Sequence, residues 1–137
     1  MGSRKDNFEL LIVDDDEMTI FLHEVHVKEN NFHSSPKIFY NGKDAFDYFN
    51  TYFSNSKSYC VMLDINMPIM NGWDFMDAIK EKGMDKNVSV IILTSSINNA
   101  DKIKAKKYDM VVDYVEKPLS IEHLNRLKTK ADIKELF

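Results

Sequence analysis

The sequence predicts an α/β fold in which helices cover both faces of a five-stranded parallel sheet. Short apolar runs alternate with segments whose apolar residues recur at helical spacing, along a chain of 137 residues. The runs are apolar at consecutive positions, as in strands that are buried on both faces. Carboxylate, hydroxyl and amine side chains follow several of these runs. Sheets of this class bind their ligands at the carboxyl ends of the strands, so these side chains indicate where a site would lie.

The first three strands are each ended by polar residues. The run 10–13 predicts the first strand and stops at three aspartates, 37–40 predicts the second and stops at Asn41-Gly42, and 59–65 predicts the third. A helix is expected after each of the first two strands. The apolar residues that indicate these helices by their spacing are Met18, Phe21, Leu22 and Val25, and then Ala45, Phe49 and Tyr52.

The alternation continues through the second half of the chain. The run 88–93 is rich in β-branched residues and predicts the fourth strand, and 111–115 predicts the fifth. The lysine-rich segment 98–108 predicts a weaker helix between them. The third and last helices are indicated by Phe75, Met76 and Ile79, and by Ile121, Leu124, Leu127 and Ala131.

Composition excludes several classes of protein. Lysine and arginine number 18 and aspartate and glutamate 22, a net charge of −4 that offers no basic footprint for nucleic acid or anionic membranes. Cys60 is the single cysteine and lies in an apolar run, which predicts a buried thiol and no internal disulfide. No apolar run approaches the roughly 18 residues of a spanning helix. We therefore expect a soluble, cytoplasmic protein that contacts neither nucleic acid nor membrane directly.

Polar side chains stand at the ends of four predicted strands. Three aspartates, 14–16, follow the first strand, and Asp64 lies near the end of the third. Thr94 follows the fourth strand, and Lys117 lies just past the fifth. The carboxyl ends of parallel strands meet at one edge of a sheet, so these groups are expected to converge there.

The residue types at this edge indicate phosphoryl chemistry. Neighbouring carboxylates cannot all ionise cheaply unless a cation lies between them. Oxygen ligands without nearby His or Cys suit Mg²⁺, or Mn²⁺, better than zinc. A carboxylate beside such an ion can act as a nucleophile and form an acyl phosphate. The Lys117 ammonium and the Thr94 hydroxyl would then hold the phosphoryl oxygens.

Four segments carry a resemblance to a known family. They occur in order from about residue 10 to residue 127 and resemble the motifs of two-component response-regulator receiver domains, such as the chemotaxis regulators. The segments are Leu11-Ile12-Val13-Asp14-Asp15-Asp16, Leu63-Asp64-Ile65-Asn66-Met67-Pro68, Ile92-Leu93-Thr94-Ser95 and Tyr114-Val115-Glu116-Lys117-Pro118. The resemblance implies a flavodoxin-like (βα)5 fold with the strand order 2-1-3-4-5.

The resemblance also implies the role of each site residue. Asp64 would accept a phosphoryl group from a sensor histidine kinase or a histidine phosphotransfer protein. Asp15, Asp64 and the backbone carbonyl of Asn66 would ligate Mg²⁺ directly, while Asp14 would act mainly through water. Thr94 and Lys117 would contact the phosphoryl group.

A switch and an output surface follow from the same resemblance. Tyr114 matches the aromatic switch position that is coupled to the Thr94 hydroxyl, although a merely packed aromatic is an equal alternative. The face built from helix four, strand five and helix five would then bind an unidentified downstream protein. The resemblance further implies a cis Lys117-Pro118 bond, a phosphoryl lifetime tuned by Asn66 and Ser96, and a monomer or weak phosphorylation-dependent dimer.

Other residues have simpler interpretations. Asp16 is interpreted as a turn or helix-capping residue. His23 and His26 lie three apart and could pair on a metal, but without a third ligand they are expected to face solvent. Trp73 and Met76 are expected in the core. Four lysines are interpreted as a solvated face, with a docking surface as the alternative: Lys102, Lys104, Lys106 and Lys107.

The residues at this edge argue against three alternatives to phosphoryl acceptance. A phosphatase of the haloacid-dehalogenase type needs a second Asp two residues after its nucleophile, where this chain has Asn66. Nucleotide binding lacks a glycine-rich loop after the first strand. A receiver fold that docks without being phosphorylated would not need the complete acidic set.

The predicted domain organisation is simple. Residues 1–8 are expected to form an amino-terminal tail, and residues 9–137 one receiver domain that includes a carboxyl-terminal helix. The chain is either a stand-alone relay that acts through protein contacts or a piece of a larger regulator. The helix-compatible composition of 128–137 favours the first of these two.

Overall fold

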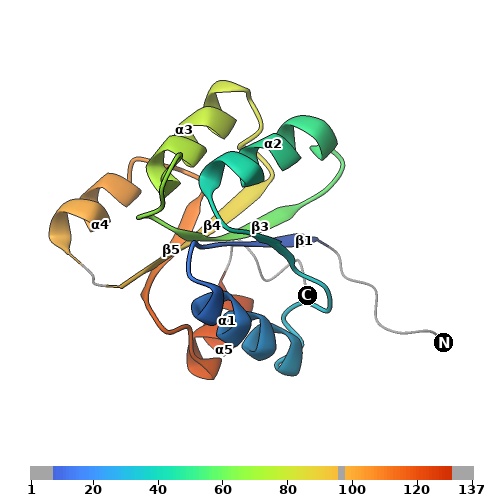
Figure 1. Cartoon of the computed structure of the whole chain (residues 1–137), viewed down its shortest axis with the longest axis vertical. Coiled ribbons are helices and arrows are strands. Elements are labelled where there is room, and N and C mark those ends of the chain that lie inside the picture. Colours follow the sequence, from blue (N-terminus) through green and yellow to red (C-terminus); the bar gives the residue numbers. More distant parts are fainter. Residues whose placement is uncertain (1–7, 96–97, 131–137) are drawn as a thin grey trace.

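The computed structural model describes residues 8–95 and 98–130, and it shows strands and helices in strict alternation (Figure 1). The elements in chain order are β1 (Glu9–Val13), α1 (Glu17–Glu29), β2 (Lys37–Phe39), α2 (Gly42–Tyr52), β3 (Tyr59–Asp64), α3 (Gly72–Glu81), β4 (Val88–Thr94), α4 (Asn99–Ala105), β5 (Val111–Glu116) and α5 (Ile121–Lys128).

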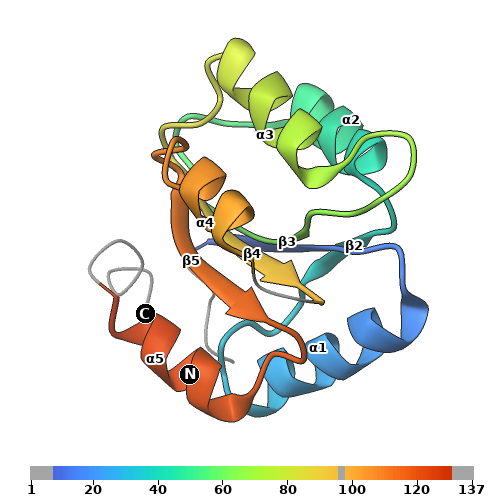
Figure 2. The same ribbon diagram turned by 90° about the vertical axis from the view of Figure 1, so that its left-hand side faces the viewer.

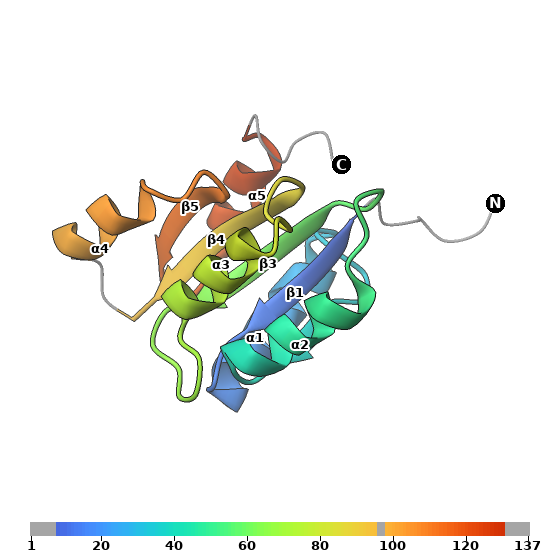
Figure 3. The ribbon, with the colours of Figure 1, turned by 90° about the horizontal axis from the view of Figure 1, so that it is seen from above.

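One parallel sheet organises the molecule. Its strand order is β2-β1-β3-β4-β5, and every neighbouring pair is parallel. Helices α2, α3 and α4 lie over one face, and α1 and α5 lie over the other (Figures 1 and 3). The predicted flavodoxin-like fold is therefore confirmed. In this register Val13 lies opposite Leu63, and Asp64 lies opposite Leu93, so the carboxyl ends of the three central strands are level.

The core consists of two apolar layers, one on each side of the sheet. Successive residues of β3 alternate between them, with Val61 and Leu63 in the layer beneath α2 and α3, and Cys60 and Met62 in the opposite layer. The expected burial of Cys60, Trp73 and Met76 is confirmed. Because β3 is buried along its whole length, its final residue is carried into the site on a rigid element.

Side-chain caps begin the helices directly after the loops at the strand ends. Asp16 accepts a hydrogen bond from the Met18 N–H and starts α1, which confirms its predicted capping role. The other described helices begin in the same way, from the N-caps Asn41, Asn71, Asn98 and Ser120. These caps fix where each loop ends, and so they fix the loops that surround the carboxyl edge of the sheet.

The buried face of α1 differs from the one that the apolar spacing predicts. The helix buries Ile20, His23 and Val27, whereas Met18 and Phe21 are 74% and 65% exposed. The expectation of a solvent-facing His23 is wrong, since its exposed fraction is 0%. Apolar residues occur all around this helix, so periodicity could not select the buried face.

Some expectations fall at or beyond the limits of the described residues. α4 is shorter than the predicted 98–108 and ends at Ala105. Ser96, Ala131 and most of the predicted terminal segments lie outside the described residues. Phe8, at the amino-terminal limit, is buried and packs edge-on against Phe32. Each helix in the described part of the chain is too short or too polar to cross a bilayer.

Candidate functional site

Three carboxylates meet at the carboxyl edge of the sheet. Asp14 and Asp15 directly follow β1, and Asp64 is the last residue of β3; one carboxylate oxygen from each lies within 4.8 Å of the others. We call Asp14, Asp15 and Asp64 the acidic triad. Asp14 and Asp64 are 2% and 6% exposed, and Asp15 is exposed. In the described parts of the chain this is the one group of three or more potential metal ligands.

Lys117 supplies positive charge to the triad. Its ammonium lies 2.6 Å from Asp14 Oδ2 and 3.5 Å from Asp64 Oδ1, and its side chain is only 14% exposed. Its backbone N–H donates to the carbonyl of Thr94 across the β4–β5 pair, at 2.7 Å. The Lys117-Pro118 bond is cis, as the resemblance implies. The sequence did not indicate that Lys117 would lie closer to Asp14 than to Asp64.

The electrostatics of the edge act most strongly on Asp64. Burial and the neighbouring Asp14 and Asp15 raise the pKa of Asp64 to about 6, against the opposing effects of Lys117 and of a hydrogen bond from the Asn66 N–H. One ammonium therefore does not neutralise the three carboxylates, and the edge holds an excess of negative charge.

Two glycines allow the loop after Asp64 to pack closely. A Cβ at Gly72 would lie 2.7 Å from the Asp64 carbonyl oxygen, and a Cβ at Gly42 would lie 2.4 Å from the Met70 carbonyl oxygen. Between them, Ile69 has a φ of 70° and is 79% exposed. A β-branched residue is strained in this conformation. No sequence pattern indicated this strain, which lies five residues after Asp64.

Thr94 and Tyr114 are neighbours, as the predicted switch requires. Thr94 ends β4 and is buried, and Tyr114 lies on β5. Burial and Asp101 raise the pKa of Tyr114, while the Thr94 side chain lowers it by hydrogen bonding. Even so, the Tyr114 hydroxyl oxygen is buried and makes no hydrogen bond of ordinary geometry within the described residues. A small movement of either side chain could therefore bring the Tyr114 hydroxyl into a hydrogen bond with Thr94.

The predicted surface residues are divided between two environments. The four lysines of the α4 segment are exposed, as both a solvated face and a docking surface require, and Lys104 also lies 4.7 Å from the centre of the Trp73 ring. His23 lies behind Lys117, where its Nε2 accepts the N–H of Leu119 at 3.3 Å. The sequence missed this contact because it joins residues that are 96 positions apart.

The donor set at this edge fits a hard divalent cation. Mg²⁺ and Mn²⁺ prefer oxygen ligands such as carboxylates. Two of the three carboxylates here are buried, and Lys117 balances only part of their negative charge. A divalent ion would offset the repulsion from Asp14 and Asp15, which adds to burial in raising the pKa of Asp64. The acidic triad is therefore the group that would hold such an ion, and the Asn66 carbonyl remains a predicted fourth ligand.

Known proteins resemble this chain in sequence and structure. A family model described as the response regulator receiver domain matches residues 10–128. The probable methanogenesis regulatory protein FilR2 of Methanothrix harundinacea is 29% identical over 97% of this chain and 85% of its own length. The crystal structure of a two-component response regulator from Cytophaga hutchinsonii has a TM-score of 0.80 and 29% identity, covering 90% of this chain and 95% of that one. A CheY-like receiver domain protein from Methanospirillum hungatei has a TM-score of 0.66 and 28% identity, over 95% and 97% of the two chains.

Proposed function

Because the chain belongs to the response regulator receiver domain family, we propose that Asp64 accepts a phosphoryl group from a histidine kinase or histidine phosphotransfer protein. The observation that carries this proposal is the position of Asp64. It ends the central, fully buried strand, within reach of two further carboxylates and of the Lys117 ammonium. In the cytoplasm the protein would act on no external substrate and would catalyse only its own phosphorylation and dephosphorylation.

The proposed transfer uses the Asp64 carboxylate as the nucleophile. A carboxylate oxygen attacks the phosphorus of a phosphohistidine, the P–N bond breaks, and its electron pair returns to the partner's imidazole, which is then protonated by solvent. Lys117 would move from Asp14 toward the phosphoryl oxygens and balance their charge. Thr94 would donate its hydroxyl to another of these oxygens.

Mg²⁺ would be held by the acidic triad and the Asn66 carbonyl, with Mn²⁺ as a substitute. When bound, the ion supplies positive charge that stabilises the transferring phosphoryl group. The carboxylates of Asp14 and Asp15 would then serve to hold that charge beside Asp64. Without the ion, the excess negative charge of the three carboxylates would repel an anionic donor.

Exposed apolar side chains on α1 support a protein as the phosphodonor. Met18, Phe21 and Leu22 are each at least 40% exposed, and they follow the aspartates at the carboxyl edge within the next two helical turns. Large apolar side chains that gather on a surface mark sites of protein contact. We propose that the donor contacts this side of α1 while its phosphohistidine reaches Asp64.

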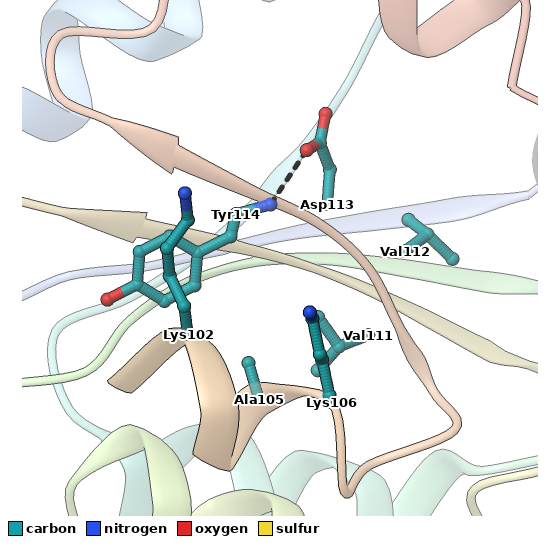
Figure 4. Close-up of a pocket in the computed structure, with 7 residues that line it drawn as sticks. All are labelled: Lys102, Ala105, Lys106, Val111, Val112, Asp113 and Tyr114. Carbon is teal, nitrogen blue, oxygen red and sulfur yellow. Dashed lines mark hydrogen bonds between the residues drawn. The ribbon is translucent and has the colours of Figure 1, made fainter. Parts of the chain in front are cut away.

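The output surface is proposed to lie along α4, β5 and α5. A cavity of about 230 Å³ lies between α4 and β5, with Lys102 and Lys106 on one side and Tyr114 on the other (Figure 4). If a phosphoryl group drew the Thr94 hydroxyl inward, Tyr114 would follow and reshape this cavity. The downstream protein would bind one of the two shapes better than the other.

Phosphorylation by a small donor tests the acceptor directly. With Mg²⁺ and acetyl phosphate the protein should gain one acid-stable, base-labile phosphate, measured by mass spectrometry of the intact chain. Asp64→Asn should gain none. Asp16→Asn is a matched control, because Asn keeps the helix cap and should still be phosphorylated. Undiminished labelling of Asp64→Asn would contradict the assignment.

A second experiment tests the proposed coupling. Backbone amide signals of residues 102–116 should shift when Mg²⁺ and beryllofluoride, a phosphoryl mimic, are added to the wild-type protein. Thr94→Val keeps the shape of the side chain but removes its hydroxyl, so the shifts near β5 should largely disappear. Equal shifts in both proteins would contradict a role for Thr94 in the switch.

A further inference from the structure

His23 is a buried polar side chain that the proposed transfer does not use. α1 directs Ile20, His23 and Val27 toward the sheet, and the exposed fraction of His23 is 0%. α1 lies beside α5 on this face of the sheet (Figure 2), and the turn that leads into α5 contains Lys117. The histidine therefore stands where the first helix meets the segment that carries the site's ammonium group.

His23 holds the backbone just after Lys117. Its Nε2 accepts the N–H of Leu119 at 3.3 Å. The intervening residue, Pro118, has no N–H, so Leu119 is the first residue after Lys117 whose backbone can donate a hydrogen bond. On the other side, the N–H of Lys117 itself donates to the Thr94 carbonyl at 2.7 Å. The backbone of Lys117 is thus tied on both sides.

The hydrogen bond from the Leu119 N–H requires one tautomer of the His23 imidazole. An Nε2 that accepts an N–H carries no proton, so the neutral ring holds its proton on Nδ1. Burial, and then the charges of Lys117 and His26, lower the pKa of His23 to about 4, which keeps the ring neutral at physiological pH. Its Nδ1 is buried and has no hydrogen-bond partner within the described residues.

An unpaired Nδ1–H in the core costs stability, and an apolar side chain of similar size would avoid that cost. Unlike an apolar side chain, however, His23 offers an acceptor, Nε2, for the N–H of Leu119. Together with Thr19, Leu22 and His23 of α1, the Lys117-Pro118 segment lines an open cavity of about 320 Å³, so close packing does not hold this turn from all sides.

We propose that His23 is a positioning residue for phosphoryl acceptance, which fixes the turn 117–119 so that the Lys117 ammonium stays over the acidic triad. This inference rests on the proposed function. Lys117 lies 2.6 Å from Asp14 but 3.5 Å from Asp64, so a small displacement of its backbone would move the ammonium away from the acceptor. Displacements of about 1 Å can slow a reaction by as much as 10²-fold.

Three substitutions separate positioning from packing. His23→Leu fills the volume without an acceptor, His23→Gln places an acceptor near the position of Nε2, and His23→Asn places one near Nδ1 instead. With Mg²⁺ and acetyl phosphate, we expect the phosphorylation rate to fall about tenfold in the Leu and Asn variants. The Gln variant should stay within about threefold of wild type. In urea, His23→Leu should unfold about as easily as wild type, because it removes the unpaired Nδ1–H but leaves the Leu119 N–H without its acceptor.

Nuclear magnetic resonance tests the hydrogen bond without any phosphorylation. The ¹⁵N shifts of His23 should show the Nδ1–H tautomer, and the Leu119 amide should exchange faster with solvent in the Leu variant than in the Gln variant. An Nε2–H tautomer would overturn the proposal.

The kinetic outcomes also distinguish this inference from the proposed function. A folded His23→Leu protein that is phosphorylated at the wild-type rate overturns the role of His23 alone. A slow variant that is also less stable, and that Gln does not restore, overturns it in favour of simple packing. A wild-type protein that gains no phosphate overturns the proposed function, and the role of His23 with it.

Discussion

The two ends of the parallel sheet hold their carboxylates in opposite ways. At the amino end, Glu9 of β1 accepts a hydrogen bond from the Tyr48 hydroxyl and pairs with Lys57 at 3.0 Å. Burial raises the pKa of Glu9, but these hydrogen bonds outweigh it and leave the pKa below its usual value. The folded protein therefore stabilises the ionised form of Glu9 relative to the unfolded chain.

At the carboxyl end, the acidic triad shares Lys117, and the pKa of Asp64 is raised to about 6. The sheet thus carries, at one end, a carboxylate whose ionised form is favoured by folding and, at the other, one whose ionised form is opposed by folding. The difference separates a group that stabilises the fold from one whose ionised form the fold opposes, and carboxylates of the second kind are common at functional sites. Removing charges at the two ends should therefore have opposite consequences.

The largest difference should appear when the lysine of each end is removed. Lys117→Met leaves the acidic triad without its ammonium, and we expect phosphorylation by acetyl phosphate to slow by on the order of 10²-fold. Lys57→Met removes the matching charge from Glu9 and should leave the rate unchanged. Initial rates of phosphate incorporation measure both. Equal rates in Lys117→Met and wild type would remove Lys117 from the mechanism.

The triad is also expected to cost stability in metal-free protein. Because the pKa of Asp64 lies near 6 in the folded protein and is ordinarily 3.8, folding favours its protonated form. Its contribution is fully present below about pH 4 and is lost as the pH rises through 6. Asp64→Asn should thus be more stable than wild type by up to about 3 kcal/mol at pH 8. That difference should vanish near pH 4.

Urea unfolding in EDTA measures this difference at each pH. The comparison of two proteins matters, because His23 has a depressed pKa and acts in the opposite direction, losing stability as the pH falls from about 6.5 toward 4. His23 is present in both proteins and cancels. A difference that does not depend on pH would contradict the ionisation of Asp64 as its cause.

Part of this site is predictable from the sequence alone. The positions of Asp14 and Asp64 were predictable, since strands that are apolar throughout, such as β1 and β3, lie inside a parallel sheet. The position of Lys117 was predictable because the carboxyl ends of parallel strands meet at one edge of the sheet. The capping role of Asp16 followed from local chemistry alone. These features depend on neighbours along the chain or on the sheet rule.

Features that depend on the orientation of one element against another were not predictable. α1 is apolar on all sides, so nothing in its pattern showed that His23 would be buried and Phe21 exposed. The partners of Glu9, Tyr48 and Lys57, likewise come from distant segments of the chain. Roles in transfer and switching stay predictions that the geometry supports.

Added Mg²⁺ should remove part of the contrast between the ends. Binding at the acidic triad stabilises the folded state, by about 1.4 kcal/mol at a concentration roughly tenfold above the dissociation constant. Thermal unfolding with and without Mg²⁺ should show this gain in wild type and in Glu9→Gln. The gain should be much smaller in Asp15→Asn, which loses one member of the triad. A gain of equal size in all three proteins would place the ion elsewhere.

The smallest effect is expected at the amino end. Glu9→Gln keeps the shape of the side chain but replaces ionic partners with neutral ones, and Lys57 is largely exposed, so solvent screens much of the interaction. We expect a loss of about 0.5–1 kcal/mol at pH 7 in urea unfolding. Because the folded pKa of Glu9 is lowered, this loss should shrink as the pH falls below about 4.5. If Glu9→Gln were more stable than wild type at pH 7, folding would oppose the ionised form of Glu9 as it opposes that of Asp64. The contrast between the two ends of the sheet would then fail.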